Sequence, residues 1–417
     1  MQQAAAGTVS LAAASSLSSR AFAAGGDKIR LGLIGCGGRG TYDSSNCLKA
    51  APNVELVAMG DMFKDRLVGC RNTLSSNLPD KVKVTDDTCF VGWDAYKKVI
   101  GADVDLVILT TPPHFRPMQL QAAVEAGKHV FMEKPVAVDP VGVRSVIASS
   151  ERADRKGLTI LAGTQMRRIS HLVEAVRRIH DGAIGKLVGG QCFRLGGGMR
   201  GWGPKTRAPG WSDMEWQLRR WLFMTWLSGD FIVEMHVHNL DVMNWAIGAH
   251  PVQVMAMGGR QQRTEPEYGD SYDHFAAEYE YPNGLRISYQ GAQQDGISNP
   301  HHQRVVGTKG TAELDFARAV IEGANAAEIG WDEYNPCMTA HADQIKAIRQ
   351  GKRLNEGRRI AESSLTAIMG RMSAYTGRAL KWDWALNASK LDLSPPAYKF
   401  GDLDMPEVAI PGKTRLT

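Results

Sequence analysis

Three glycines at fixed spacing form the first residues of this sequence whose types suggest a specific chemistry. Gly35, Gly37 and Gly40 make a G-x-G-x-x-G motif directly after the apolar run 29–34. In such a motif the first glycine permits a tight turn, the second lets the backbone approach a pyrophosphate, and the third lets the following helix pack closely. The N-terminal N–H groups of that helix then face the anion. The motif therefore predicts a dinucleotide site, although glycine-rich turns are also common without one.

An acidic residue supports this interpretation. Asp61 lies 21 residues beyond Gly40, after a second apolar run, where a dinucleotide fold places the carboxylate that holds the ribose hydroxyls. A helix N-cap or turn residue is the alternative interpretation of Asp61. An acid there repels a 2′-phosphate, so the sequence favours NAD, with NADP as the alternative because Arg39, Lys64 and Arg66 are close in sequence.

Other polar residues fit the oxidation of an alcohol. Hydride transfer from a secondary alcohol requires a base for the hydroxyl proton and a cation or donor for the developing alkoxide. Lys134 follows an apolar run, 129–132, and can bind a substrate oxygen at that strand end. Glu234, His238 and Asp241 are spaced so that they share one face if they lie on a helix. The alternative for Lys134 is an ordinary solvated lysine. The alternative for the other three residues is an ordinary amphipathic helix with a hydrogen-bonded histidine.

A metal site is a further alternative, because His236, His238 and a nearby acid resemble a ligand set. On a helix His236 points about 200° away from His238, so the two imidazoles cannot share one ion. The sequence therefore predicts no metal.

The order of apolar runs and amphipathic segments indicates two domains. Residues 27–160 alternate between strand-like and helix-like segments, which predicts a doubly wound parallel sheet. Residues 161–388 change pattern and carry an Asn-Gly hairpin signal at Asn283 and Gly284. The strands expected in this second part are 187–194, 252–257, 276–281, 285–289 and 312–316. Two helices are expected within 338–376, packed against the first domain.

Several motifs give the chain a family resemblance. The motifs are GCGGRG, Thr111-Pro112, AGKHVFMEKP (126–135), AGTQMRR (162–168), SGDFIVEMHVHNLDVMNW (228–245) and GTKGTAELDF (307–316). Together they make residues 28–385 resemble the glucose–fructose oxidoreductase / inositol dehydrogenase / MocA (Gfo/Idh/MocA) family. The resemblance implies an α/β fold, with an N-terminal Rossmann doubly wound parallel sheet and a C-terminal α/β domain. That second domain would contain a large, mostly antiparallel open sheet, with one face as the substrate floor and the other as a homodimer or homotetramer interface.

The resemblance also implies roles for individual residues. His238 would be the catalytic proton acceptor, with Lys134 and Glu234 beside it, and the peptide bond before Pro135 would be cis. Glu234 stands where the family usually has an aspartate, and His236 where a glycine is common, which leaves the substrate open. The expected cofactor-binding residues are Gly35, Gly37, Gly38, Arg39, Gly40, Asp61, Thr111, Pro112, His114, Glu133, Lys134 and Gln165. The expected substrate-binding residues are Lys134, Arg167, Glu234, His238, Asp241 and Trp211, the last from a tryptophan-rich stretch, 202–226, that could stack on sugar faces.

The two ends of the chain carry different signals. Residues 1–26 are rich in Ala and Ser and end in an A-x-A pattern at 21–23, which predicts an exported, periplasmic protein. The basic start of a signal is missing, so a twin-arginine signal that begins upstream is one explanation, and a disordered segment on a cytoplasmic protein is the alternative. Residues 389–417 are polar and Pro-spaced, and are expected to form an arm that wraps a neighbouring domain or subunit.

Composition excludes several classes of protein. With 43% hydrophobic and 22% charged residues and a net charge of +5, the chain resembles a globular protein rather than a nucleic-acid-binding one. No apolar run reaches the roughly 18 residues of a membrane span. The six cysteines lack a C-x-x-C pair and are expected to be free thiols.

The sequence thus predicts an NAD(P)-dependent oxidoreductase that takes hydride from a ring hydroxyl of a carbohydrate, that is a sugar or glycoside, or of a cyclitol. One alternative is an NAD-dependent glycosidase, which oxidises, eliminates and re-reduces without net redox change. The other is a non-catalytic sugar- or dinucleotide-binding protein.

Overall fold

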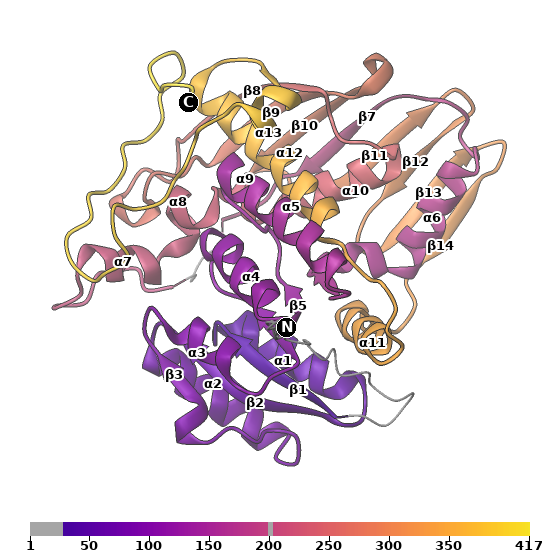
Figure 1. Ribbon diagram of the computed structural model, residues 1–417. Helices are drawn as coiled ribbons and strands as arrows, with labels where there is room; N and C mark the ends of the chain where they lie inside the picture. Colours follow the sequence, from indigo (N-terminus) through magenta and orange to yellow (C-terminus); the bar gives the residue numbers. More distant parts are fainter. Residues whose placement is uncertain (1–27, 199–202) are drawn as a thin grey trace, which may run out of the picture.

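The computed structural model describes residues 28–198 and 203–417. The signal-like segment 1–26 and Trp202 lie outside the described residues. Figure 1 shows the first domain in indigo and violet, with the larger second sheet above it.

The first domain is built on six parallel strands in the order β3-β2-β1-β4-β5-β6. This order reverses direction between β1 and β4, which is where doubly wound sheets bind dinucleotides. The predicted Rossmann sheet is therefore confirmed. The strands are β1 (Ile29–Ile34), β2 (Val54–Asp61), β3 (Cys89–Val91), β4 (Leu106–Leu109), β5 (His129–Met132) and β6 (Ile160–Ala162).

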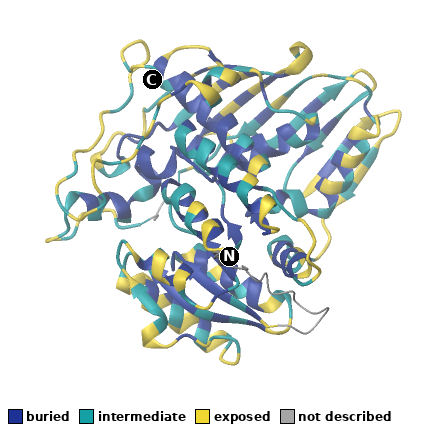
Figure 2. Ribbon diagram, viewed as in Figure 1, coloured by how far each residue is buried: buried dark blue, intermediate teal, exposed yellow. Residues whose placement is uncertain are grey.

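Helices cover both faces of this sheet, and the strands β1, β4, β5 and β6 are largely apolar and almost entirely buried, whereas the edge strand β3 is partly exposed (Figure 2). The first helix begins at Gly38, so the last residues of the glycine motif already form its first turn. The helices are α1 (Gly38–Ala50), α2 (Lys64–Asn77), α3 (Ala95–Gly101), α4 (Arg116–Glu125) and α5 (Pro140–Arg155).

The second domain contains a nine-stranded sheet in the order β14-β13-β12-β11-β7-β10-β9-β8-β15. Only β7 and β10 run parallel, so the expected mostly antiparallel sheet is confirmed. Asn283 and Gly284 adopt positive φ, 66° and 76°, in the turn that joins β9 to β10, as the hairpin signal predicted. The strands are β7 (Leu187–Arg194), β8 (Gln253–Gly259), β9 (His274–Glu280), β10 (Arg286–Ala292), β11 (His301–Gly307), β12 (Gly310–Leu314), β13 (Arg318–Gly323), β14 (Ala327–Gly330) and β15 (Leu380–Lys381).

Helices lie on one face of the larger sheet and join it to the first domain (Figure 1). Two of them, α11 and α12, return from the C-terminal part of the chain and pack on α1 and α5 of the first domain, as expected. The helices of this part are α6 (Ser170–His180), α7 (Asp213–Arg219), α8 (Thr225–Ser228), α9 (Phe231–Glu234), α10 (Val237–Ile247), α11 (Pro336–Arg349), α12 (Gly357–Thr376) and α13 (Trp382–Asn387). None of the helices in residues 28–198 and 203–417 is long and apolar enough to cross a membrane.

The C-terminal segment 389–417 lies along both domains of its own chain and is the yellow trace beside α7 and α8 in Figure 1. The backbone N–H of Leu393 donates to Asp139 in the first domain at 2.9 Å. Gln217 of α7 and Tyr272 of the second domain donate to the carbonyls of Leu403 and Ala409. The segment therefore ties the two domains together.

The buried His341 of α11 makes the stability of the fold sensitive to acid. Its ring packs 4.2 Å from that of Phe131, and both ring nitrogens are buried without a partner among the described residues. Burial, and then the charges of Arg39 and Arg168, lower the pKa of His341 to about 3. Below about pH 6.5 the histidine of the unfolded chain binds a proton that the folded chain excludes. The free energy of unfolding is therefore highest above that pH and decreases as the pH falls below it.

Replacing His341 with leucine is therefore expected to make unfolding less dependent on pH. The loss of unfolding free energy between about pH 7.5 and about pH 5 should shrink by about 2 kcal/mol, measured by urea denaturation. His180→Leu, which removes an exposed histidine of α6, is measured in the same way as the control. A His341→Leu protein with the pH dependence of the wild type would contradict this account.

Candidate active site

A cavity of about 850 Å³ lies at the carboxyl ends of the first sheet and extends to the second domain. It brings together residues that are far apart in the sequence. The predicted site residues that line it are Gly35, Gly37, Gly38, Arg39, Asp61, Thr111, Pro112, Glu133, Lys134, Glu234 and His238.

The glycine loop has the shape that a pyrophosphate requires. Gly35 has φ 97°, and a Cβ on Gly40 would lie 2.0 Å from the carbonyl oxygen of Gly35, so both positions need glycine for packing within the chain. A Cβ on Gly37 or Gly38 would meet no heavy atom within 4 Å. The space above these two residues is therefore open, beside the first-turn N–H groups of α1, which have no partner within the helix. The loop fits a dinucleotide.

Asp61 lies at the end of β2 on the wall of the same cavity. One carboxylate oxygen accepts the N–H of Cys36 at 2.6 Å and the other that of Phe63 at 2.8 Å. These bonds fix the orientation of the carboxylate, and each oxygen retains a second lone pair for a ribose hydroxyl. Burial raises the pKa of Asp61, and the two backbone bonds oppose that rise.

Glu133 lines the cavity, but its carboxylate is bound to an arginine of the glycine loop. Its carboxylate accepts from Nε of Arg39 at 2.9 Å, and Arg39 also reaches Asp43 at 3.1 Å. Glu133 is only 2% exposed. It therefore holds Arg39 at the start of α1, where the side chain lines the cavity.

Lys134 and Glu234 meet across the two domains. The Lys134–Pro135 peptide bond is cis, as the resemblance implied. Nζ of Lys134 donates to the backbone carbonyl of Glu234 at 2.5 Å and to its Oε1 at 3.0 Å. The ion pair thus places a cation at the end of β5, facing the second domain.

Glu234 and His238 do not lie on one continuous helix, so the condition for a shared helical face is not met. Helix α9 ends at Glu234 and α10 begins at Val237. The break is held by His236, whose buried ring bonds through Nδ1 to the hydroxyl of Tyr289 at 2.6 Å. Both Glu234 and His238 nevertheless line the cavity.

His238 has the properties of a proton acceptor. Burial, and then the positive charges of Lys134 and Arg194, lower the pKa of His238 well below its ordinary value. The imidazole is therefore neutral at pH 7. Its Nδ1 is buried without a hydrogen-bond partner among the described residues.

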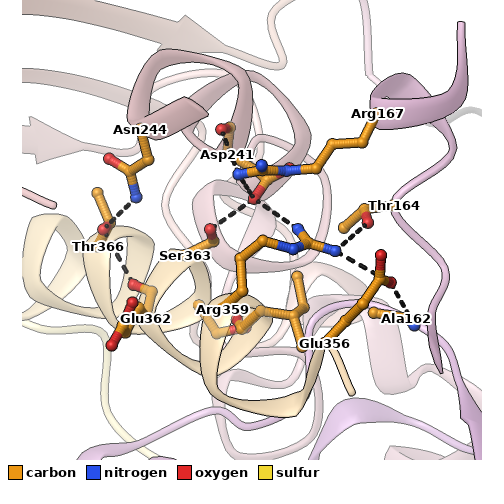
Figure 3. Close-up of polar contacts among 12 residues, drawn as sticks. Ala162, Thr164, Arg167, Asp241, Asn244, Glu356, Arg359, Glu362, Ser363 and Thr366 are labelled. Carbon is orange, nitrogen blue, oxygen red and sulfur yellow. Dashed lines mark hydrogen bonds and ion pairs between the residues drawn. The ribbon is translucent and has the colours of Figure 1, made fainter. Parts of the chain in front are cut away.

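Arg167 and Asp241 do not reach the cavity, because they bind each other (Figure 3). Asp241 accepts from Nε of Arg167 at 2.7 Å, from Arg359 at 3.2 Å and from Ser363 at 2.6 Å. Arg359 also donates to Thr164 at 3.0 Å. The network joins α10, which carries His238, to α12 and to the end of β6.

Four other predicted residues lie outside the cavity lining: Gly40, which packs against Gly35, and His114, Gln165 and Trp211. His114 is buried and bonds through Nε2 to the hydroxyl of Tyr398 at 2.8 Å, and burial lowers its pKa to about 4. Gln165 lies beyond β6 with its Oε1 buried and unpartnered among the described residues. Trp211 packs against Arg219, whose guanidinium lies 4.7 Å from the ring centre.

Sequence reasoning missed most of the aromatic side chains in the wall of the cavity and three of its arginines, Arg116, Arg194 and Arg219. The aromatic residues that line it are Phe63, Trp93, Tyr96, Phe115, Trp221 and Tyr398, of which Trp221 belongs to the tryptophan-rich stretch 202–226 singled out in the sequence. Phe63 follows Asp61 by two residues, and this proximity could have predicted that Phe63 lines the cavity. Tyr398 comes from the C-terminal segment, and Arg194 ends β7, so no local pattern pointed to either. Within residues 28–198 and 203–417, no three His, Cys, Asp or Glu side chains gather in a way that could hold a metal ion.

Comparison with known proteins gives this site its context. Residues 29–162 match the oxidoreductase family with an NAD-binding Rossmann fold, and residues 172–313 match the GFO/IDH/MocA C-terminal domain. The chain belongs to the GFO/IDH/MocA oxidoreductase family. The resemblance in the motifs is thereby confirmed, and the first domain is an NAD-binding Rossmann domain.

Two curated relatives show the range of this family. The chain is 27% identical over 228 residues to 2,7-anhydro-N-acetylneuraminate hydratase of Escherichia coli K12, a match that covers 54% of the chain and 55% of the hydratase. It is 24% identical over 294 residues to scyllo-inositol 2-dehydrogenase (NAD(+)) of Bacillus subtilis 168, covering 70% of the chain and 75% of the dehydrogenase. The chain thus spans about half the length of the first relative and three quarters of the second.

A solved structure agrees on the fold. The crystal structure of aldose-aldose oxidoreductase from Caulobacter crescentus, complexed with glycerol, aligns with a TM-score of 0.66 at 19% identity. The alignment covers 85% of this chain and 99% of that one. At this identity the comparison establishes the shared two-domain architecture.

Proposed function

We propose that the chain is an NAD-dependent dehydrogenase that oxidises a ring hydroxyl of a sugar, glycoside or cyclitol. One observation carries the proposal. A lysine held by a carboxylate and a neutral, buried histidine lie in the wall of the cavity that also contains the dinucleotide loop. These are the groups that alcohol oxidation requires beside a hydride acceptor.

The cofactor and three side chains each have a separate role in the oxidation. NAD, when bound over the glycine loop, supplies the hydride acceptor. Lys134 donates a hydrogen bond to the reacting hydroxyl oxygen and stabilises the negative charge that develops on it. His238 accepts the proton of the hydroxyl group while the hydride leaves the carbon that bears this group. The alcohol thereby becomes a carbonyl and loses two electrons. Glu234 holds Lys134 in position and offers a carboxylate oxygen to a neighbouring substrate hydroxyl.

A panel of sugars, glycosides and cyclitols, each incubated with NAD, tests this function. We expect at least one compound to give NADH, seen as absorbance at 340 nm, without release of an aglycone. Release of an aglycone without net NADH would identify the glycosidase alternative. Failure of the whole panel, with NAD bound to the protein, would support the non-catalytic alternative.

We also propose that the chain forms a homo-oligomer through the outer face of the nine-stranded sheet. On β8, Val254 and Ala256 face the buried side, whereas Met255 and Met257 are 44% and 72% exposed on the other side. Exposed methionines in a row on an open sheet face fit a protein interface. Light scattering should find a dimer or tetramer, and Met257→Glu should shift it towards monomer. A wild-type chain that stays monomeric at high micromolar concentration would refute this interface.

A further inference from the structure

Arg194 is a cation in the cavity wall to which neither the motifs nor the proposed chemistry gives a role. It is the last residue of β7 and lies on the same face of that strand as the buried Cys192. Together with Glu234 and His238 it lines the part of the cavity contributed by the second domain. It therefore lies on the substrate side of the site.

The guanidinium of Arg194 is almost unpartnered. Its Nη1 donates to Oδ1 of Asn239 at 3.0 Å, which is a neutral acceptor. Within residues 28–198 and 203–417, no ion pair joins Arg194 to a carboxylate, whereas Arg39 binds both Asp43 and Glu133, and Arg167 binds Asp241. A guanidinium carries five N–H donors, so most of those of Arg194 remain available.

The charges around Arg194 do not balance. Lys134 is neutralised by Glu234 in an ion pair of 3.0 Å, and His238 is neutral. Burial lowers the pKa of Arg194, and Glu234 opposes that change, but arginine keeps its charge at neutral pH. Among the described residues, no carboxylate forms an ion pair with Arg194, whose positive charge lies at the substrate end of the cavity; Arg116, another lining arginine, donates to the carbonyl of Pro135.

We propose that Arg194 binds a carboxylate of the substrate, so that the substrate is a sugar acid of the uronate type. The planar fork of arginine matches a carboxylate through two parallel hydrogen bonds, and partly buried charges are stable when paired in this way. A neutral hydroxyl would satisfy one donor and leave the charge uncompensated. This inference rests on the proposed function, because it names the substrate class of the same site.

The test compares matched pairs of compounds on the full-length, NAD-loaded protein. The pairs are glucuronate with glucose, galacturonate with galactose, and mannuronate with mannose, and both the dissociation constant and NADH formation are measured. We expect the acid of at least one pair to bind at least about tenfold more tightly than its neutral partner. Arg194→Gln should abolish that preference, and Arg194→Lys should retain part of it, because the charge remains but the fork is lost.

A control variant and three outcomes complete the experiment. Arg155→Gln removes an exposed arginine at the end of α5 and should keep the acid preference intact. Equal binding of acids and neutral sugars, absence of binding by all six compounds, or an acid preference that survives in Arg194→Gln would each overturn the role of Arg194. NADH formed from neutral sugars without acid preference would leave the dehydrogenase standing. Acid preference without any NADH would instead count against the dehydrogenase while supporting Arg194.

Discussion

Replacing Lys134 with alanine is expected to lower kcat/KM for hydride transfer by about a thousandfold or more, with NAD affinity changed less than about threefold. The reason is that Lys134 is the cation at the end of β5 that can stabilise the developing alkoxide, whereas the proposal assigns the dinucleotide to the glycine loop and Asp61 in the same cavity. Steady-state kinetics at 340 nm and a fluorescence titration with NAD measure the two quantities separately.

The variant leaves the carboxylate of Glu234 without its lysine, so folding must be checked by thermal unfolding. Lys49→Ala, at an exposed position in the last turn of α1, serves as a matched control and should behave as the wild type. Normal turnover by Lys134→Ala would remove the lysine from the mechanism. A large loss of NAD affinity would instead assign it to the cofactor.

Replacing Asp241 with alanine is expected to lower the free energy of unfolding by about 3–5 kcal/mol. Asp241 is 1% exposed and accepts hydrogen bonds from Arg167, Arg359 and Ser363. Without it, Arg167 retains no carboxylate partner among the described residues, while Arg359 keeps Glu356 at 3.0 Å. Urea denaturation at neutral pH measures the change.

An exposed ion pair provides the comparison. Glu174→Ala breaks the surface contacts with Arg177 and Arg178 on α6 and should lower the free energy of unfolding far less than Asp241→Ala does. A loss below about 1 kcal/mol for Asp241→Ala would show that the network in Figure 3 does not hold α10 to α12. The network would then not be what fixes α10, and with it His238, in position.

The parts of the fold that could be predicted from the sequence depend on local patterns. The glycine spacing, the apolar strand before it and Asp61 all lie within one strand–helix–strand unit, so their relation is fixed by chain geometry. The hairpin at Asn283 and Gly284 was predictable for the same reason, because its positive φ angles require these residue types.

The parts that could not be predicted depend on contacts between distant segments. The break between α9 and α10 is held by the bond from His236 to Tyr289 on β10, which no helical periodicity reveals. Asp241 was expected in the substrate site, but Arg359, 118 residues away, and Arg167 hold it elsewhere. Tyr398 reaches the cavity only because the C-terminal segment lies along its own chain.

Some strands of the second sheet were also missed, for a related reason. Strand β11, with the sequence HHQRVVG, buries Gln303 and Val305 on one face and leaves polar side chains on the other. Strands β13 and β14 are short and lie at the edge of the sheet, where exposed Arg318 and Glu328 form an ion pair. Such strands gain their stability from neighbouring strands rather than from an apolar pattern.

Transfer of deuterium from substrate to cofactor is the most direct measurement of the central claim. Sugars and cyclitols deuterated at every ring carbon would be incubated with the protein and NAD, and the reduced cofactor examined by mass spectrometry. The account predicts that the nicotinamide gains deuterium with the wild type and gains none with Lys134→Ala. Reduced cofactor without deuterium, or equal transfer by both proteins, would contradict it.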